Sequence, residues 1–159
     1  MRDAAGADIA FWPAGIIRDD FSGSDLSRMV DIPGDILVVS ELSGKQIKAA
    51  LDRSISLYPS ANDAFLYLSG VEVRFKRELD PAKRVVSIKV GGSPLDLSRK
   101  YKVALPMSLA RGGYGYFTVW DKKAIVHELE GVAVESLLKG KTSVKQTDRW
   151  TLIDDESGV

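Results

Sequence analysis

One amphipathic helix, delimited at both ends by its own residues, constrains the fold of this chain more than any other feature. Ser43 precedes Gln46 by three residues, which is the spacing of a capping box at a helix N-terminus. Pro59 ends the segment, because proline lacks a backbone donor and clashes with the preceding turn. Between these limits, residues of one face recur about every 3.6 positions: Ile47, Ala50, Leu51, Ser54 and Ile55. The pattern predicts a helix over residues 44–58 with one face against a core.

Strand patterns surround this helix. Residues 71–77 and 84–90 alternate apolar with polar side chains, so we expect them to pair as antiparallel strands with one buried and one wet face. Further strands are expected at 7–12, 36–42, 65–70, 101–106 and 149–154, and shorter helices at 25–30 and 130–140. Because hairpins and helices are mixed, the order favours the α+β class, as a single domain with a mixed β-sheet packed with helices.

Composition narrows the function classes. The 159 residues suffice for one domain, and a net charge of zero from 22 basic and 22 acidic residues argues against a nucleic-acid partner. No apolar run approaches the roughly 20 residues that cross a bilayer, so we expect no membrane contact. The N-terminal residues MRDAAGAD do not form a signal peptide. Cysteine is absent and His127 is the single histidine, so we expect no catalytic residue, metal site or cofactor in this chain.

Four segments, taken in order, resemble the C-terminal domain of the 5′-nucleotidase family. They are ADIAFWPAGIIR, PGDILVVSELSGKQIKAALD, FLYLSGVEVRF with RVVSIKVGGSPLDLSRKYKVAL, and LARGGYGY. Each motif alone is weak, but their order and spacing extend over nearly the whole chain. The resemblance implies one domain over residues 1–153 and an acidic tail over residues 154–159. MRDAAGAD resembles the end of the first helix of this domain, so we expect that helix to be truncated and the chain to begin partway into the domain.

The resemblance also implies a function. In this family the domain supplies the substrate pocket of a metallophosphoesterase, and an N-terminal domain carries two metal ions and the hydrolytic chemistry. We therefore expect a substrate-recognition domain that is not catalytic alone and serves the hydrolysis of a nucleotide or related phosphoester. The expected partners are an N-terminal metallophosphoesterase domain, in cis or in trans, and a nucleotide or other small anionic ligand. Divalent metals are expected only in that other domain, and the family is often periplasmic or extracellular.

The resemblance carries over a small set of candidate substrate-binding residues: Arg18, Gly15, Gly112, Gly113, Tyr114 and Tyr116. Arg18 matches an arginine on the phosphate or ribose side, and a guanidinium binds phosphate through two parallel hydrogen bonds. The two tyrosines are candidates for a stacking surface. Alternative interpretations remain open: Arg18 pairs with a neighbouring carboxylate, the glycines serve a turn with positive φ, and the tyrosines pack beside the loop.

Several positions depart from the family pattern. Pro13 stands where an asparagine reads the base, and Pro33 and Ser108 stand where two phenylalanines stack on it. Tyr114 replaces the aspartate that holds the ribose hydroxyls. The alternative function is therefore a stand-alone, degenerate domain that acts as a binding or interaction module without nucleotide binding. Loss of the cover that a full first helix provides would expose apolar surface, which favours self-association.

Overall fold

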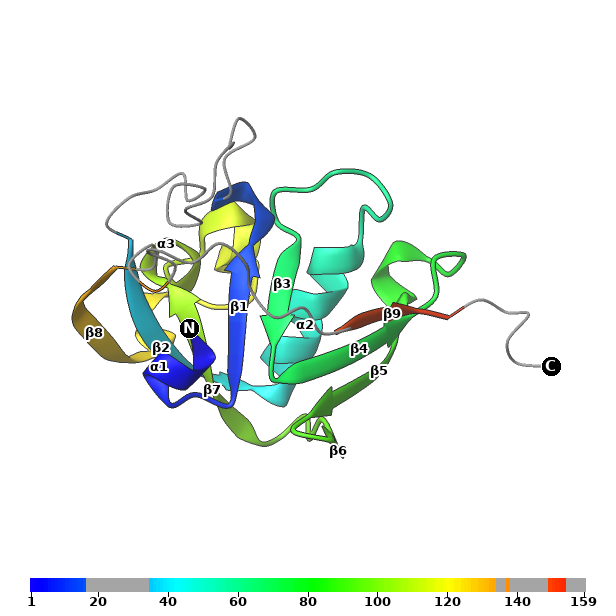
Figure 1. Ribbon diagram of the computed structural model, residues 1–159. Helices are drawn as coiled ribbons and strands as arrows, with labels where there is room; N and C mark the ends of the chain where they lie inside the picture. The colour runs from blue at the N-terminus through cyan, green and yellow to red at the C-terminus, as the bar shows by residue number, and fades with distance from the viewer. Residues whose placement is uncertain (17–34, 134–136, 138–148, 154–159) are drawn as a thin grey trace.

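The computed structural model describes residues 1–16, 35–133, 137 and 149–153. Its helices are α1 (Arg2–Ala5), α2 (Gly44–Ile55) and α3 (Met107–Ala110), with short 3₁₀ turns η1 (Ala14–Ile16), η3 (Pro81–Lys83), η4 (Gly113–Thr118) and η5 (Lys122–Ala124). Its strands are β1 (Ile9–Pro13), β2 (Ile36–Ser43), β3 (Leu66–Ser69), β4 (Val71–Phe75), β5 (Val85–Val90), β6 (Ser93–Pro94), β7 (Lys100–Pro106), β8 (Ile125–Ala133) and β9 (Trp150–Leu152). Figure 1 shows their arrangement.

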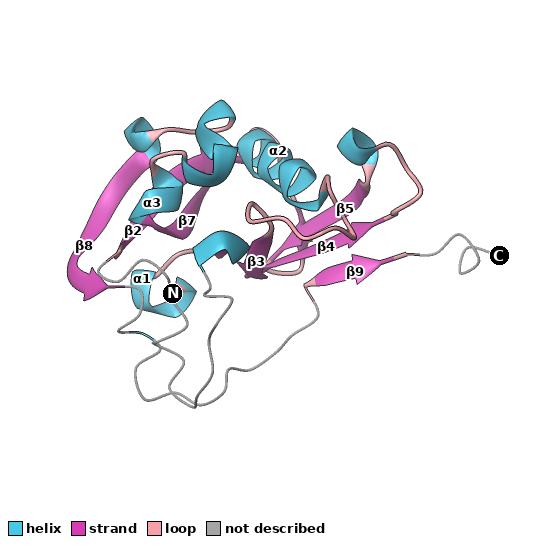
Figure 2. Cartoon of the chain, turned by 90° about the horizontal axis from the view of Figure 1, so that it is seen from above, coloured by secondary structure: helices cyan, strands magenta, loops and turns pink. Residues whose placement is uncertain are grey.

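Two mixed sheets contain these strands. The larger has the order β3-β1-β7-β2-β8, with β1 and β7 parallel and the other neighbours antiparallel. The smaller has the order β6-β5-β4-β9, with β4 and β9 parallel. Figure 2 shows α2 above the strands, and the buried residues of α2 share one core with β1, β2, β3, β4 and β7. The expected α+β class is confirmed, with two sheets in place of one.

The predicted capping box starts α2. The Gln46 N–H donates to Ser43 Oγ (3.1 Å), and the Ser43 N–H donates to Gln46 Oε1 (2.9 Å). The helix ends at Ile55, three residues before the expected limit. Arg84 Nη1 donates to the carbonyl oxygens of Ile55, Ser56 and Tyr58 at 3.2, 3.0 and 2.9 Å. A side chain from outside the helix thus satisfies the terminal carbonyls that another helical turn would otherwise occupy.

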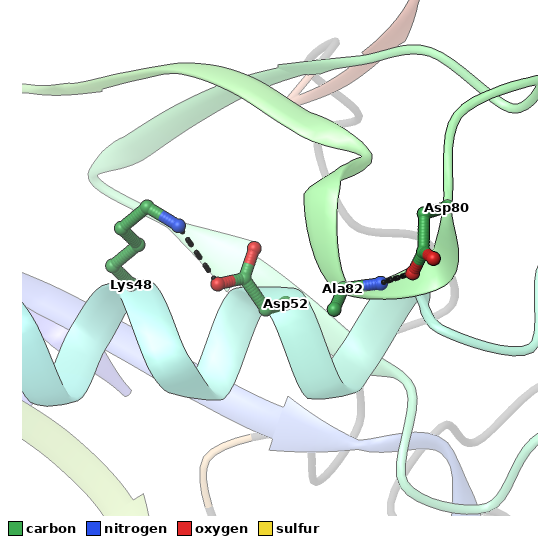
Figure 3. A network of polar contacts seen from close by, with 4 residues as sticks. All are labelled: Lys48, Asp52, Asp80 and Ala82. Carbon is green, nitrogen blue, oxygen red and sulfur yellow. Dashed lines mark hydrogen bonds and ion pairs between the residues drawn. The ribbon is translucent and has the colours of Figure 1, made fainter.

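The polar side of α2 faces η3, as Figure 3 shows. Lys48 Nζ and Asp52 Oδ2 form an ion pair at 2.8 Å with helical i,i+4 spacing. Asp80 accepts the Ala82 N–H at 3.1 Å and so caps η3 beside the helix. The Lys48 side chain is 43% exposed, so this pair contributes only about 0.3–0.5 kcal/mol. Packing of the opposite, apolar face therefore holds α2 in place.

Other expectations have mixed outcomes. The antiparallel pair of strands is confirmed, with Val71 opposite Val90. The helix expected over residues 130–140 is wrong over residues 130–133, which belong to β8, the strand antiparallel to β2 in which Ala133 pairs with Ile36. Residues 134–136 and 138–140 lie outside the described residues. The side of β2 away from β7 supplies backbone hydrogen-bond partners to β8, and this pairing outweighs the local helical spacing of the sequence. The helix expected over residues 25–30 lies outside the described residues. No helix in the described part of the chain has the length and apolar character required to cross a membrane.

Ser54 links α2 to the edge strand β3, because its buried Oγ accepts the Leu66 N–H at 2.8 Å. Leu66 faces Pro13 in the β1–β3 register, and because proline has no N–H to donate, the Leu66 carbonyl accepts instead from Trp150 Nε1 at 2.9 Å. Ser54→Ala should leave the Leu66 N–H buried and unsatisfied, which lowers the free energy of unfolding by about 1–3 kcal/mol in urea titration. Ser56→Ala is the matched control and should cost less. Equal losses in the two variants would contradict the assigned role of Ser54.

Candidate functional site

The structure brings two of the segments singled out in the sequence into contact: the Gly15 turn in η1 and the loop of residues 112–116. A Cβ atom built on Gly15 would overlap Tyr114 Cε1 and lie 2.9 Å from Asp63 Cβ. The Gly15 N–H donates to the Asp63 carbonyl at 2.9 Å, and the Ala14 N–H donates to the Phe65 carbonyl at 2.7 Å. Position 15 therefore requires glycine, because the Tyr114 ring and Asp63 lie too close to the backbone for a side chain. Arg18 and Pro33 lie outside the described residues.

The loop of residues 112–116 has an unusual backbone. Gly112 and Gly115 have φ values of 96° and 82°, which suit glycine. Gly113 lets the loop backbone pass close to Ser108, since a Cβ at position 113 would lie 2.7 Å from the Ser108 carbonyl oxygen. Tyr114 has a φ of 59°, the one positive φ among the described residues other than glycine. An L-residue pays about 1–2 kcal/mol in this conformation, and such strain persists where surrounding contacts impose it.

Arg53 of α2 supplies one of these contacts. Its Nη2 donates to the Tyr114 carbonyl at 2.8 Å, and its guanidinium lies 5.3 Å from the centroid of the Tyr116 ring. A Cβ on Gly115 would lie 2.6 Å from Arg53 Cζ, so the loop backbone runs directly along the guanidinium. Arg53 Nε is buried without a hydrogen-bond partner. The half-buried Arg53 side chain therefore fixes the position of this loop relative to α2.

Tyr116 anchors the same loop in the core. Its side chain is fully buried, its ring stacks on Trp120 with centroids 5.0 Å apart, and its hydroxyl donates to the Ala64 carbonyl at 2.5 Å. Burial raises the pKa of the Tyr116 phenol well above its usual range. A ligand could stack on this ring only if the ring left the core. The structure therefore places Tyr114, and not Tyr116, at the surface of the site.

Ser108, which stands at the position of a stacking phenylalanine, belongs to this neighbourhood together with Asp35 and Phe117, which the sequence did not single out. Ser108 Oγ donates to Asp35 Oδ2 at 2.5 Å, and the Ser108 N–H donates to Asp35 Oδ1 at 3.1 Å. Asp35 is only 7% exposed, so this pairing fixes the start of α3 against the start of β2. Phe117 is 72% exposed, and its backbone packs against Gly112. Its position directly after the glycine-rich motif was the available signal.

The described residues contain no group of three or more His, Asp or Glu side chains that could hold a metal ion. His127 lies in β8, where its side chain is exposed.

The contact between Gly15 and Tyr114 predicts an energetic coupling. Gly15→Ala should lower the free energy of unfolding by about 1–3 kcal/mol, because the new methyl group overlaps the Tyr114 ring. Tyr114→Gly removes that ring and relieves the backbone strain, so the double variant should recover part of the loss. Urea titration of the four proteins gives the coupling in a double-mutant cycle. Additive effects would contradict the contact.

Burial of Tyr116 predicts a dependence of stability on pH. Below about pH 10 the phenol is protonated in both folded and unfolded chains, so its contribution to stability is complete. Above that pH it ionises only in the unfolded chain, and stability falls by up to about 1.4 kcal/mol per pH unit. Urea titration from pH 8 to about 10.5 should show a steeper fall for the wild type than for Tyr116→Phe. Tyr67→Phe, at a half-exposed ring, should follow the wild type. Parallel curves for the wild type and Tyr116→Phe would refute the assignment.

Comparison with known proteins agrees with this geometry. Residues 1–122 match the family described as "5′-nucleotidase, C-terminal domain". The chain is 33% identical over 125 residues to the trifunctional nucleotide phosphoesterase protein YfkN of Bacillus subtilis, which covers 72% of this chain and 8% of that protein. It is 32% identical over 91 residues to the 5′-nucleotidase of Bos taurus, which covers 52% of this chain and 16% of the relative.

A solved structure shares the fold. The crystal structure of a 5′-nucleotidase precursor from Thermus thermophilus superposes with a TM-score of 0.75 at 26% identity, over 97% of this chain and 33% of that one. The chain therefore spans only a small part of the length of these relatives. On the match over residues 1–122, the chain belongs to the family of 5′-nucleotidase C-terminal domains.

Proposed function

We propose that this chain is the substrate-recognition domain of a 5′-nucleotidase-like phosphoesterase and is not catalytic alone. One observation carries the proposal: the Gly15 turn and the loop of residues 112–116, which hold the recognition motifs of the resemblance, meet through the Tyr114 ring. The matched regions cover 8% of the length of YfkN and 16% of that of the Bos taurus 5′-nucleotidase, so each of these relatives has room for a separate chemical domain.

In this proposal, substrate binding belongs to this chain and hydrolysis belongs to a separate domain. A pair of divalent metal ions, where present in a phosphoesterase, polarises the phosphoryl group and activates water. The described residues offer no suitable ligand group for such ions, so no step at a metal is assigned to them. The task of this chain is to bind and orient the phosphoester. Arg18, which follows the Gly15 turn in the sequence, is the proposed phosphate ligand, because a guanidinium binds phosphate through two charge-assisted hydrogen bonds.

A second candidate is a stand-alone interaction module. The pairing of Ser108 with Asp35 favours it, because the hydroxyl at this position is already engaged and offers no aromatic face to a base. Self-association through exposed apolar surface belongs to this second proposal. The same binding experiment separates the two.

The test is calorimetric titration of the purified chain with inorganic phosphate, glycerol 3-phosphate and AMP. At least one of these should bind, and Arg18→Ala should weaken it by about 10- to 100-fold, the effect of losing charge-assisted hydrogen bonds. Arg77→Ala, at an exposed arginine, is the control and should bind like the wild type. Absence of binding, or equal affinities for the wild type and Arg18→Ala, would contradict the recognition role of Arg18 and favour the interaction module.

A further inference from the structure

The smaller sheet buries one face and leaves the other in solvent. Its core side is formed by Val71, Val73, Ile88, Val90 and Trp150. Because side chains alternate along a strand, the residues between these point the other way. This outward face, in which β9, β4 and β5 lie side by side (Figure 1), carries the exposed residues Glu72, Arg74, Lys89 and Thr151.

Arg74 lies at the centre of the outward face. It is directly opposite Ser87 of β5 and directly opposite Thr151 of β9. Neighbouring strands are about 4.7–4.9 Å apart, so a carboxylate bound by the guanidinium is within reach of both hydroxyl groups. None of the ion pairs between described residues includes Arg74. Its charge is therefore available to a partner.

Lys89 supplies a second positive charge. It lies two residues beyond Ser87, so it is diagonal to Arg74 across the β4–β5 pair, and such positions are about 7–8 Å apart. Glu72 lies directly opposite Lys89, and Arg149, directly before β9, adds a third cation. Cations therefore outnumber carboxylates on this face, although the net charge of the whole chain is zero.

We propose that the outward face of β5, β4 and β9 binds an extended, acidic segment of another protein. In an extended chain, alternate side chains point to one side and are about 6.5 Å apart. This spacing is close to the diagonal separation of Arg74 and Lys89, so two carboxylates at alternate positions reach both cations at once. A single small anion engages only one exposed cation, and such a contact contributes little binding free energy.

Other polyanions fit this face less well. Single-stranded nucleic acids bind to basic grooves in which aromatic rings stack on the bases, but Phe75 and Trp150 of these strands point to the core side. Arg74, Lys89 and Arg149 are fewer than the about 4–8 Lys or Arg side chains that typically attach a protein to an anionic membrane. The carboxylates of a polypeptide are therefore the chemistry that the charge pattern favours.

The experiment is an NMR titration of the isotope-labelled chain with a synthetic peptide in which glutamate alternates with serine. The amides of β4, β5 and β9 should show the largest shifts, and the affinity should fall as salt is added. The same peptide with glutamine in place of glutamate is the matched control. It should bind at least about tenfold more weakly, because it cannot form charge-assisted hydrogen bonds.

Substitutions on the face test the individual charges. Arg74→Ala should weaken binding of the peptide by about tenfold, and Arg74→Lys should recover only part, because lysine cannot form two parallel hydrogen bonds. Lys89→Ala should weaken it by about three- to fivefold, whereas Lys45→Ala, at an exposed lysine of α2, should bind like the wild type. Glu72→Gln should tighten binding by about two- to fivefold, because it removes the carboxylate opposite Lys89. A general loss of stability does not produce such a gain.

Absence of peptide binding, or equal weakening by Lys89→Ala and Lys45→Ala, would overturn the inference. Tighter binding of oligothymidylate, or of phosphatidylglycerol vesicles, than of the peptide would also overturn it, because the partner would then be of another class. Weaker binding by Glu72→Gln would contradict the role of the charge balance. These outcomes are independent of the proposed function, because none of the substituted residues belongs to the Gly15 turn or to the loop of residues 112–116.

Discussion

The buried hydrogen bond from the Tyr116 hydroxyl to the Ala64 carbonyl is the interaction on which the arrangement of the loops depends. It joins the loop of residues 112–116 to the segment that leads into β3. That segment in turn accepts the N–H groups of η1, through the carbonyls of Asp63 and Phe65. Two loops far apart in the sequence are therefore fixed to one point of the core. The stack of Tyr116 on Trp120 surrounds this point with apolar contacts and keeps water from competing for the bond.

In this arrangement the proposed ligand-binding residues lie on loops, and residues of the helices and strands hold those loops in position. Binding residues commonly lie on loops, but a loop discriminates between ligands only when its own position is well defined. Here α2 contributes Arg53 to the Tyr114 carbonyl, and Asp35 at the start of β2 holds Ser108. The strain at Tyr114 is the cost of directing an aromatic ring at the neighbouring turn. The surrounding contacts offset that cost, because each is made by a residue that packing already holds in place.

Local patterns predicted the parts of the fold that local physics determines. The capping box of α2 and the alternation in β4 were predicted correctly, since spacing alone specifies them. The alternation in β5 was wrong at Val86, which is 46% exposed, because the pairing with β4 shifts register between Arg74 and Phe75. The predictions over residues 130–133 failed because pairing with β2 depends on a strand about 90 residues away in the chain. For the same reason, the helical pattern, whose apolar face does not include Arg53, could not show that this side chain reaches a loop 61 residues away. Nor did the motif GGYGY reveal that Tyr116 is buried while Tyr114 lies over Gly15.

The most direct test of this account is to locate the ligand on the chain by amide chemical-shift mapping with glycerol 3-phosphate. If the Gly15 turn and the loop of residues 112–116 form one recognition site, the amides of Gly15, Gly113 and Tyr114 should show the largest shifts and move along a common binding curve. The amides of β8 and of the β6-β5-β4-β9 sheet should move little. Shifts that centred on those strands, or that affected only one of the two loops, would contradict the central claim.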